Sequence, residues 1–205
     1  MRVLVLLLML KGKFIVIYGV NNTGKTTQAK LLVDKLNREG YQTEYLKYPR
    51  YDLKPTGPRI NAYLRKNNPE NLSAQEAQTL YAQNRKDYEN ELKKKLDQGI
   101  NIVAEDYTGT GIAWGLGAGV DKQYLLKINQ DLLKEDLAFL FEGQRFMQAQ
   151  EDSHTHETNQ ELVAKVRQAH LKLGEEFGWQ KINANLTKEE IHDIIWQEVQ
   201  KHLNS

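Results

Sequence analysis

The segment from Lys13 to Gly40 constrains the fold more than any other part of the sequence. An uninterrupted apolar run, KFIVIYG, covers residues 13–19 and is typical of a strand buried on both faces of a sheet. A glycine-bearing loop follows, and residues 26–40 then show the leucine spacing of a helix that ends at a glycine. A strand, a glycine loop and a helix in this order favour an α/β fold built on a parallel sheet.

The loop itself reads GVNNTGKT, residues 19–26, and matches the pattern G-x-x-x-x-G-K-[ST]. In this pattern the glycines let backbone N–H groups converge on phosphates, and the dipole of the following helix adds partial positive charge there. The lysine is expected to reach the β- and γ-phosphates, and the threonine hydroxyl to bind Mg²⁺. We therefore predict a site for a nucleoside triphosphate with magnesium, made by Gly19, Asn21, Asn22, Thr23, Gly24, Lys25, Thr26 and Thr27.

The rest of the chain continues the alternation of strands and helices. The helix that begins at Ser73 opens with a capping box, SAQE, and a second box lies at Thr187 and Glu190. The pattern predicts a five-stranded parallel sheet with helices on both faces. Further strands are expected at residues 42–49, 102–104, 137–142 and 179–184, and further helices at 60–64, 73–99, 121–133, 157–175 and 188–203.

The amino-acid composition argues against several classes of function. The sequence has no cysteine, which excludes disulfides, thiolate zinc sites and a cysteine nucleophile. The formal net charge is +1, which argues against nucleic acid as the main partner.

The apolar residues 3–10 are too few to span a bilayer, and no small-residue cleavage site follows them. We expect no membrane association. Residues 1–8 are interpreted as an extension upstream of a natural start at Met9, with an added strand or a packing tail as the alternative. Residues 9–205 are interpreted as a single domain.

A phosphate loop occurs in several enzyme classes, so other features have to choose among them. The N-K-x-D motif that reads guanine in GTPases is absent, and 205 residues are few for a motor or a helicase. A small five-strand domain with a helical insert after the second strand favours a kinase of nucleotides or nucleosides.

Several motifs, in order along the chain, resemble the thymidylate kinase family. They are YGVNNTGKTTQ at the loop, KYPRY after the second strand, TLYAQNR in the long helix and EDYTGTGIAW after the third strand. The resemblance covers about residues 11–203. It implies a P-loop kinase fold with a short lid, transfer of the γ-phosphate of ATP to dTMP, Mg²⁺ as cofactor, and a cytoplasmic homodimer.

The resemblance also assigns an acceptor site. Arg50 matches the arginine that holds the acceptor phosphate, and Arg85 matches a second acceptor-site arginine. Tyr81 matches the aromatic residue that stacks on thymine, with a core aromatic as the alternative. Residues four apart share a helix face, so Tyr81 and Arg85 can face one nucleotide. The other expected acceptor residues are Asp106, Tyr107, and Thr110 and Gly111 in a glycine-rich turn, with Trp114 packed behind them.

A polar lid is expected at residues 143–156. Family members carry arginines in the lid or in the phosphate loop that neutralise the transferring phosphoryl group, and Arg145 is the only arginine in this lid. Arg145 is therefore the lid candidate for catalysis, beside Lys25 and Asp106. His154 and His156 lack a third ligand at suitable spacing and are interpreted as polar loop residues.

Three positions depart from the family pattern. Tyr18 stands where the family has Glu, Asn21 where it has Asp, and Asp106 where it has Arg. We hypothesise that Asp106 pairs with Asn21 or accepts a hydrogen bond from the deoxyribose hydroxyl. The two acceptor-site arginines would then carry the acceptor phosphate alone.

Glu105 keeps an acid at the end of the third strand, which suits a role near Mg²⁺ beside Thr26. The alternative is a carboxylate satisfied by local backbone N–H groups.

Two other functions remain open from the sequence. A deoxynucleoside kinase must deprotonate a sugar hydroxyl, for which Asp106 or Glu105 could serve as the base. A nucleotide-binding protein with weakened transfer activity would explain the departures, although the intact Lys25 and Thr26 speak against it.

Overall fold

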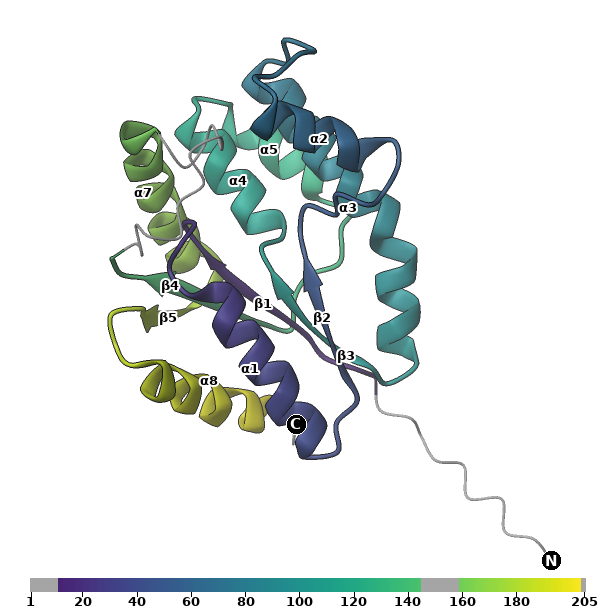
Figure 1. The fold of residues 1–205 in the computed structure, drawn as a ribbon, viewed down its shortest axis with the longest axis vertical. Coiled ribbons are helices and arrows are strands. Elements are labelled where there is room, and N and C mark those ends of the chain that lie inside the picture. Colours follow the sequence, from purple (N-terminus) through teal and green to yellow (C-terminus); the bar gives the residue numbers. More distant parts are fainter. Residues whose placement is uncertain (1–10, 145–158, 204–205) are drawn as a thin grey trace, which may run out of the picture.

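The computed structural model describes residues 11–144 and 159–203. Its centre is one parallel sheet with the strand order β2-β3-β1-β4-β5 (Figure 1). The expected five-stranded fold is confirmed. The strands are β1 (Phe14–Gly19), β2 (Thr43–Lys47), β3 (Asn101–Glu105), β4 (Leu137–Glu142) and β5 (Gln180–Asn183).

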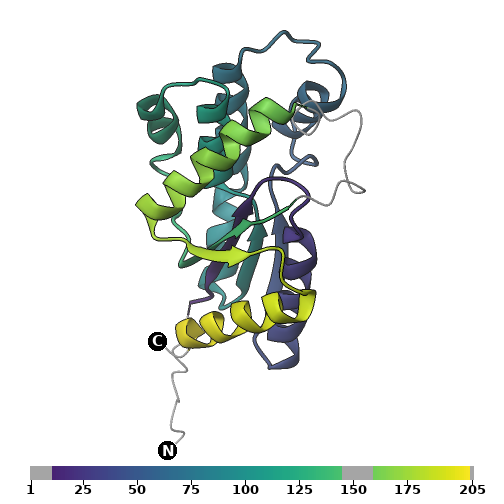
Figure 2. The ribbon, with the colours of Figure 1, turned by 90° about the vertical axis from the view of Figure 1, so that its left-hand side faces the viewer.

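Helices cover both faces of the sheet, with α7 and α8 on opposite sides of β4 and β5 (Figure 2). Helices α1 and α8 pack on one face, and α3, α4 and α7 pack on the other. The helices are α1 (Lys25–Arg38), α2 (Thr56–Arg65), α3 (Ala74–Asp97), α4 (Thr108–Gly117), α5 (Lys122–Asn129), α7 (Gln160–Phe177) and α8 (Lys188–Leu203).

The side chains of β1 point alternately to the two covered faces of the sheet, which explains why every residue of this strand is apolar. Phe14, Val16 and Tyr18 belong to the core shared with α3, α4 and α7, whereas Ile15 and Ile17 belong to the core shared with α1 and α8. Successive side chains of a strand point to opposite faces, so a central strand covered on both sides needs apolar residues at every position. The predicted central strand is confirmed, and its end delivers the phosphate loop to the carboxyl edge of the sheet.

Both predicted capping boxes are present. Ser73 caps α3 and exchanges hydrogen bonds with Glu76, and Thr187 does the same with Glu190 before α8. Among the described residues, no helix is long and apolar enough to cross a membrane. The upstream extension, Arg145 and the two lid histidines lie outside the described residues.

The glycine-rich turn expected at Thr110 and Gly111 is wrong, because these residues belong to α4. Glycine disfavours helix by about 1 kcal/mol relative to alanine, which hid this helix in the sequence. Tertiary packing overrides that preference. A Cβ on Gly109 would lie 2.4 Å from the ring of Trp179, and one on Gly111 would lie 2.4 Å from Nη2 of Arg85.

Tyr18, one of the three departures, is a core residue. Its ring stacks on Trp179 with centroids 4.1 Å apart, and its hydroxyl donates to Oε1 of Glu135 over 2.9 Å. The side chain therefore points toward α4 and α7, not into a binding site.

A buried histidine makes the fold sensitive to acid. His170 of α7 has Nδ1 3.1 Å from the carbonyl oxygen of Val166, while Nε2 has no hydrogen-bond partner. Burial lowers the pKa of His170 to about 3. The unfolded chain binds this proton near its ordinary pKa of about 6.5, so the histidine costs stability progressively as the pH falls from 6.5 toward 3.

We expect His170→Gln to flatten the pH dependence of the free energy of unfolding. Urea unfolding of both proteins at pH 7 and pH 5 measures this. The free energy of unfolding of the variant minus that of the wild type should be larger at pH 5 than at pH 7. An equal difference at both pH values would contradict the prediction.

Candidate active site

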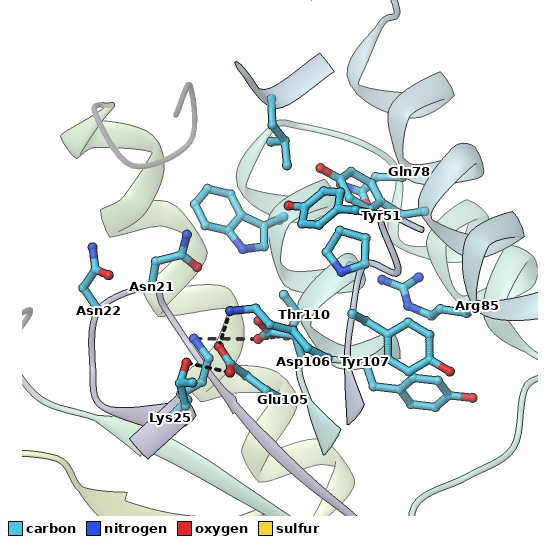
Figure 3. A pocket seen from close by; sticks show the side chains of 18 of the residues that line it. Asn21, Asn22, Lys25, Tyr51, Gln78, Arg85, Glu105, Asp106, Tyr107 and Thr110 are labelled. Atoms are coloured by element: carbon cyan, nitrogen blue, oxygen red, sulfur yellow. Dashed lines mark hydrogen bonds and ion pairs between the residues drawn. The ribbon is translucent and has the colours of Figure 1, made fainter. Parts of the chain in front are cut away.

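A cavity of about 440 Å³ opens at the carboxyl ends of β1, β2 and β3 and extends to α3 and α4 (Figure 3). This edge is where open parallel sheets bind ligands. The predicted site residues that line it are Asn21, Asn22, Gly24, Lys25, Thr26, Thr27, Tyr81, Arg85, Glu105, Asp106, Tyr107, Thr110 and Gly111. Trp114, which was expected behind the acceptor residues, lines the cavity as well.

The phosphate loop has the shape that its glycines were expected to allow. Gly19 and Gly24 have φ of 136° and 90°, in the region that favours glycine. Nζ of Lys25 donates to the carbonyl oxygens of Gly19 and Val20 at 2.9 Å each, and the Thr23 hydroxyl donates to the same Val20 oxygen. The loop thus curls around the lysine ammonium at the start of α1, which is the arrangement for binding an anion.

Glu105 is held by three side chains from two elements, α1 and β2. Its Oε2 accepts hydrogen bonds from the hydroxyls of Thr26 and Tyr45, both at 2.6 Å. Its Oε1 lies 3.0 Å from Nζ of Lys47. Burial alone would raise its pKa, but the charges of Lys25 and Lys47 and these hydrogen bonds leave the pKa below its ordinary value. The acid is therefore ionised beside the phosphate-loop threonine.

Asp106 lies between the phosphate loop and α4. Its Oδ1 accepts a hydrogen bond of 2.8 Å from Thr110 and lies 3.7 Å from Nζ of Lys25. Burial, with the negative charge of Glu105, raises its pKa although Lys25 opposes the shift. The hydrogen bond goes to Thr110 and the ion pair to Lys25, whereas the hypothesis had named Asn21 as the protein partner.

Arg85 is a buried cation beside the cavity. Its Nη1 donates to Oδ1 of Asn129 over 3.1 Å, and its Nε has no hydrogen-bond partner. No ion pair among the described residues involves it, and burial lowers its pKa. A buried guanidinium without a carboxylate is costly unless a ligand supplies acceptor atoms. Arg85 is therefore well placed to bind a polar or anionic part of a ligand.

The two predicted aromatic residues differ in their surroundings. Tyr81 is 9% exposed, packs edge-on against Tyr63 and also lines the cavity, so it is both a core residue and accessible to a ligand. Tyr107 is buried, and its hydroxyl donates to Glu89 over 3.3 Å. Its ring lies against Phe14, so this tyrosine mainly forms the floor of the cavity.

Arg50 is not among the residues that line the cavity in the described part of the chain. Its Nε and Nη2 donate to the carboxylate of Asp52 at 2.9 Å and 2.6 Å, and its guanidinium lies 4.3 Å from the centroid of Tyr88. The structure brings Arg85 to the cavity and holds Arg50 on a neighbouring surface.

The cavity also contains residues to which the sequence analysis assigned no role. Lys47, Tyr48, Pro49 and Tyr51 belong to the KYPRY motif, and the others are Leu64, Arg65 and Gln78. Lys47 is the last residue of β2 and is opposite Glu105 in the register with β3. The strand was predicted at residues 42–49, so Lys47 lay inside it, and its position beside Glu105 could be recognised only once the neighbouring strand was known.

A phosphate loop after the first strand, a sheet of order 2-3-1-4-5 and a cavity that joins the loop to a buried arginine define a P-loop kinase of nucleotides. The family model for thymidylate kinase matches residues 17–195. The chain belongs to the thymidylate kinase family and is a nucleoside monophosphate kinase, a phosphotransferase.

Individual relatives agree with this assignment. Thymidylate kinase of Plasmodium falciparum (isolate 3D7) is 30% identical over 194 residues, covering 93% of this chain and 91% of that protein. Thymidylate kinase of Danio rerio is 28% identical over 190 residues, covering 90% and 88%. The solved structure of thymidylate kinase from Candida albicans superposes with a TM-score of 0.79 at 25% identity, covering 95% and 93%.

Proposed function

We propose that this enzyme transfers the γ-phosphate of ATP to dTMP, giving dTDP and ADP. The observation that carries the proposal is the single cavity that runs from Lys25 and Thr26 to Tyr81 and Arg85. In this proposal the phosphate loop is the donor site, the part near Tyr81 and Arg85 is the acceptor site, and the two share one space. Phosphoryl transfer depends mainly on such positioning and on neutralising charge.

The donor half is the phosphate loop. In it, backbone N–H groups and the start of α1 hold the β- and γ-phosphates, and Lys25 contacts their oxygens. The carbonyl oxygens of Gly19 and Val20 keep the ammonium at the mouth of the loop, so it needs little rearrangement when ATP binds. Lys25 thereby stabilises the charge that develops on the transferring group.

Thr26 and Glu105 fit a magnesium site. Among the described residues, no group of three or more acidic, histidine or cysteine side chains could hold a metal alone. A hydroxyl and a carboxylate 2.6 Å apart at the phosphate loop suit Mg²⁺, which binds proteins through few oxygens and keeps substrate phosphates as ligands. When bound, Mg²⁺ neutralises charge on the β- and γ-phosphates. Thr26 would ligate it, and Glu105 would orient Thr26.

The acceptor half is formed by α3 and α4. Tyr81 offers a ring face to the thymine base, and Arg85 offers unused donors one helical turn away. Thr110 and Gly111 line the same wall from the first turn of α4. The acceptor phosphate is already an anion, so no general base is required. Arg145 keeps its proposed role in neutralising the transferred group.

The substrate range is tested by an ADP-release assay with dTMP, thymidine, dUMP and dCMP as separate acceptors. We expect turnover with dTMP and none with thymidine. Turnover with thymidine alone would identify a deoxynucleoside kinase. That second function has one observation in its favour, because burial raises the pKa of Asp106, as a general base requires.

Asp106 is the residue whose substitution tests the divergent acceptor site. We expect Asp106→Asn to change kcat or the KM for dTMP by roughly tenfold, since it removes a charge 3.7 Å from the ammonium of Lys25. Steady-state kinetics against both substrates measure the effect. Kinetic constants equal to those of the wild type would show that Asp106 is only a structural acceptor for Thr110.

Family membership is what supports our proposals for the assembly and the compartment. We propose a homodimer that acts in the cytoplasm. Light scattering coupled to size exclusion tests the dimer, and a monomer at micromolar concentration would contradict it.

A further inference from the structure

The middle of the cavity contains two acidic side chains where the proposed acceptor phosphate would bind. Glu105 and Asp106 both face the space between the phosphate loop and Arg85 (Figure 3). An acceptor phosphate placed there meets two acids, and like charges this close disfavour binding unless cations lie between them. Lys25 is already engaged by two carbonyl oxygens and by Asp106.

Neither acceptor-site arginine resolves this problem, and Arg65, which also lines the cavity, donates to the Tyr51 hydroxyl and to Oδ1 of Asn61. Arg50 is held by both oxygens of Asp52 and does not line the cavity. Arg85 lies under Gly111, where a single added Cβ would be 2.4 Å from its Nη2. Its guanidinium therefore has little freedom to move toward the phosphate loop.

Lys47 lies at the cavity beside Glu105, where neither Arg50 nor Arg85 lies. It ends β2, faces Glu105 across the parallel register, and lines the cavity beside Tyr48 and Pro49. Its Nζ lies 3.0 Å from Oε1 of Glu105, while its side chain is 48% exposed. An ammonium has three donors, so one can remain on the glutamate while others face the cavity.

We propose that Lys47 is a substrate-binding residue whose ammonium contacts the phosphate of the acceptor nucleotide while Glu105 holds it in place. The inference rests on the proposed function, because it requires a phosphorylated acceptor in this cavity. Lys47 neutralises the acceptor phosphate on the side of Glu105, and Lys25 serves the donor phosphates. A lysine acts as a compact charge on a flexible stem, which suits an anion that approaches between two acids.

The test compares Lys47→Met with Lys47→Arg by steady-state kinetics and by calorimetric binding. Lys47→Met should raise the KM for dTMP roughly ten- to a hundredfold, as expected for the loss of a charged hydrogen bond. The KM for ATP should change less than about threefold. Lys47→Arg should restore most of the affinity for dTMP. Binding of thymidine, which lacks the phosphate, should be the same in wild type and Lys47→Met.

Lys181→Met is the matched control. Lys181 also lies on a strand, its Nζ is 3.0 Å from a glutamate oxygen, that of Glu175, and its side chain is 47% exposed. It does not line the described cavity, so its loss should leave both KM values unchanged. This control separates the loss of any strand lysine from the loss of the one at the cavity.

Three results would overturn the inference while leaving the proposed function intact: an unchanged KM for dTMP in Lys47→Met, equal losses of ATP and dTMP affinity, or equal losses of dTMP and thymidine binding. A wild-type enzyme that does not phosphorylate dTMP overturns the proposed function itself, and the inference with it.

Discussion

Lys25→Met should reduce kcat by about 10²–10³-fold or more, the loss typical of removing one preorganised donor to developing charge. The buried ammonium lies at the mouth of the phosphate loop, and no other described cation is bound by the carbonyl oxygens of Gly19 and Val20. Its removal also leaves Asp106 without its nearby cation. The donor phosphates would then face an uncompensated acid.

The measurement is ADP release at saturating ATP and dTMP. Lys35→Met is the control, because Lys35 lies near the other end of the same helix and pairs with Glu39. It should retain wild-type kcat. Retention of more than about a tenth of the activity in Lys25→Met would contradict the role given to the phosphate-loop lysine.

Gly109→Ala should destabilise the fold by about 1–3 kcal/mol, the usual cost of overpacking a core. Helix propensity alone predicts the opposite sign, since alanine is favoured over glycine by about 1 kcal/mol inside a helix. Sterics decide the outcome. The added Cβ would lie 2.4 Å and 2.5 Å from two ring atoms of Trp179, and 3.0 Å from the ring of Tyr18. Both rings are buried and stacked on each other.

Urea unfolding of four proteins tests the cause of this loss. They are the wild type, Gly109→Ala, Trp179→Phe and the double variant. Phenylalanine lacks the ring atoms that the new Cβ would meet, so the cost of Gly109→Ala should be smaller in the Trp179→Phe background. An equal cost in both backgrounds would show that the clash with Trp179 is not the source.

Local patterns predicted the elements well where each depends on residues close in sequence. The capping boxes at Ser73 and Thr187 use side chains three positions apart, and both formed as expected. The apolar run of β1 and the glycine loop after it were equally local. The helix α4 was missed because its four glycines are explained by residues distant in the sequence and not by their neighbours in the chain. Gly109 and Gly111 pack against Trp179 and Arg85, and Gly115 and Gly117 pack against Leu125 and Val166.

Within the site, the residues of the phosphate loop could be placed from the sequence because a contiguous motif specifies their mutual geometry. The acceptor residues could not all be placed in this way. Arg50 follows β2 and Lys47 ends it, and sequence alone favoured the arginine. Arg50 is held by Asp52 and Tyr88, away from the cavity, whereas Lys47 pairs with Glu105 at the cavity.

The strand–loop–helix unit, the alternation of strands and helices, and the family could all be predicted from the sequence. These properties depend on spacing within one segment, which the chain carries with it before it folds. Which cations reach the cavity could not be predicted, because it is set by how distant segments pack. The answer depends on β3 lying between β2 and β1, because this order brings both Lys47 and Thr26 to Glu105. It is therefore a property of strand order and of no single segment.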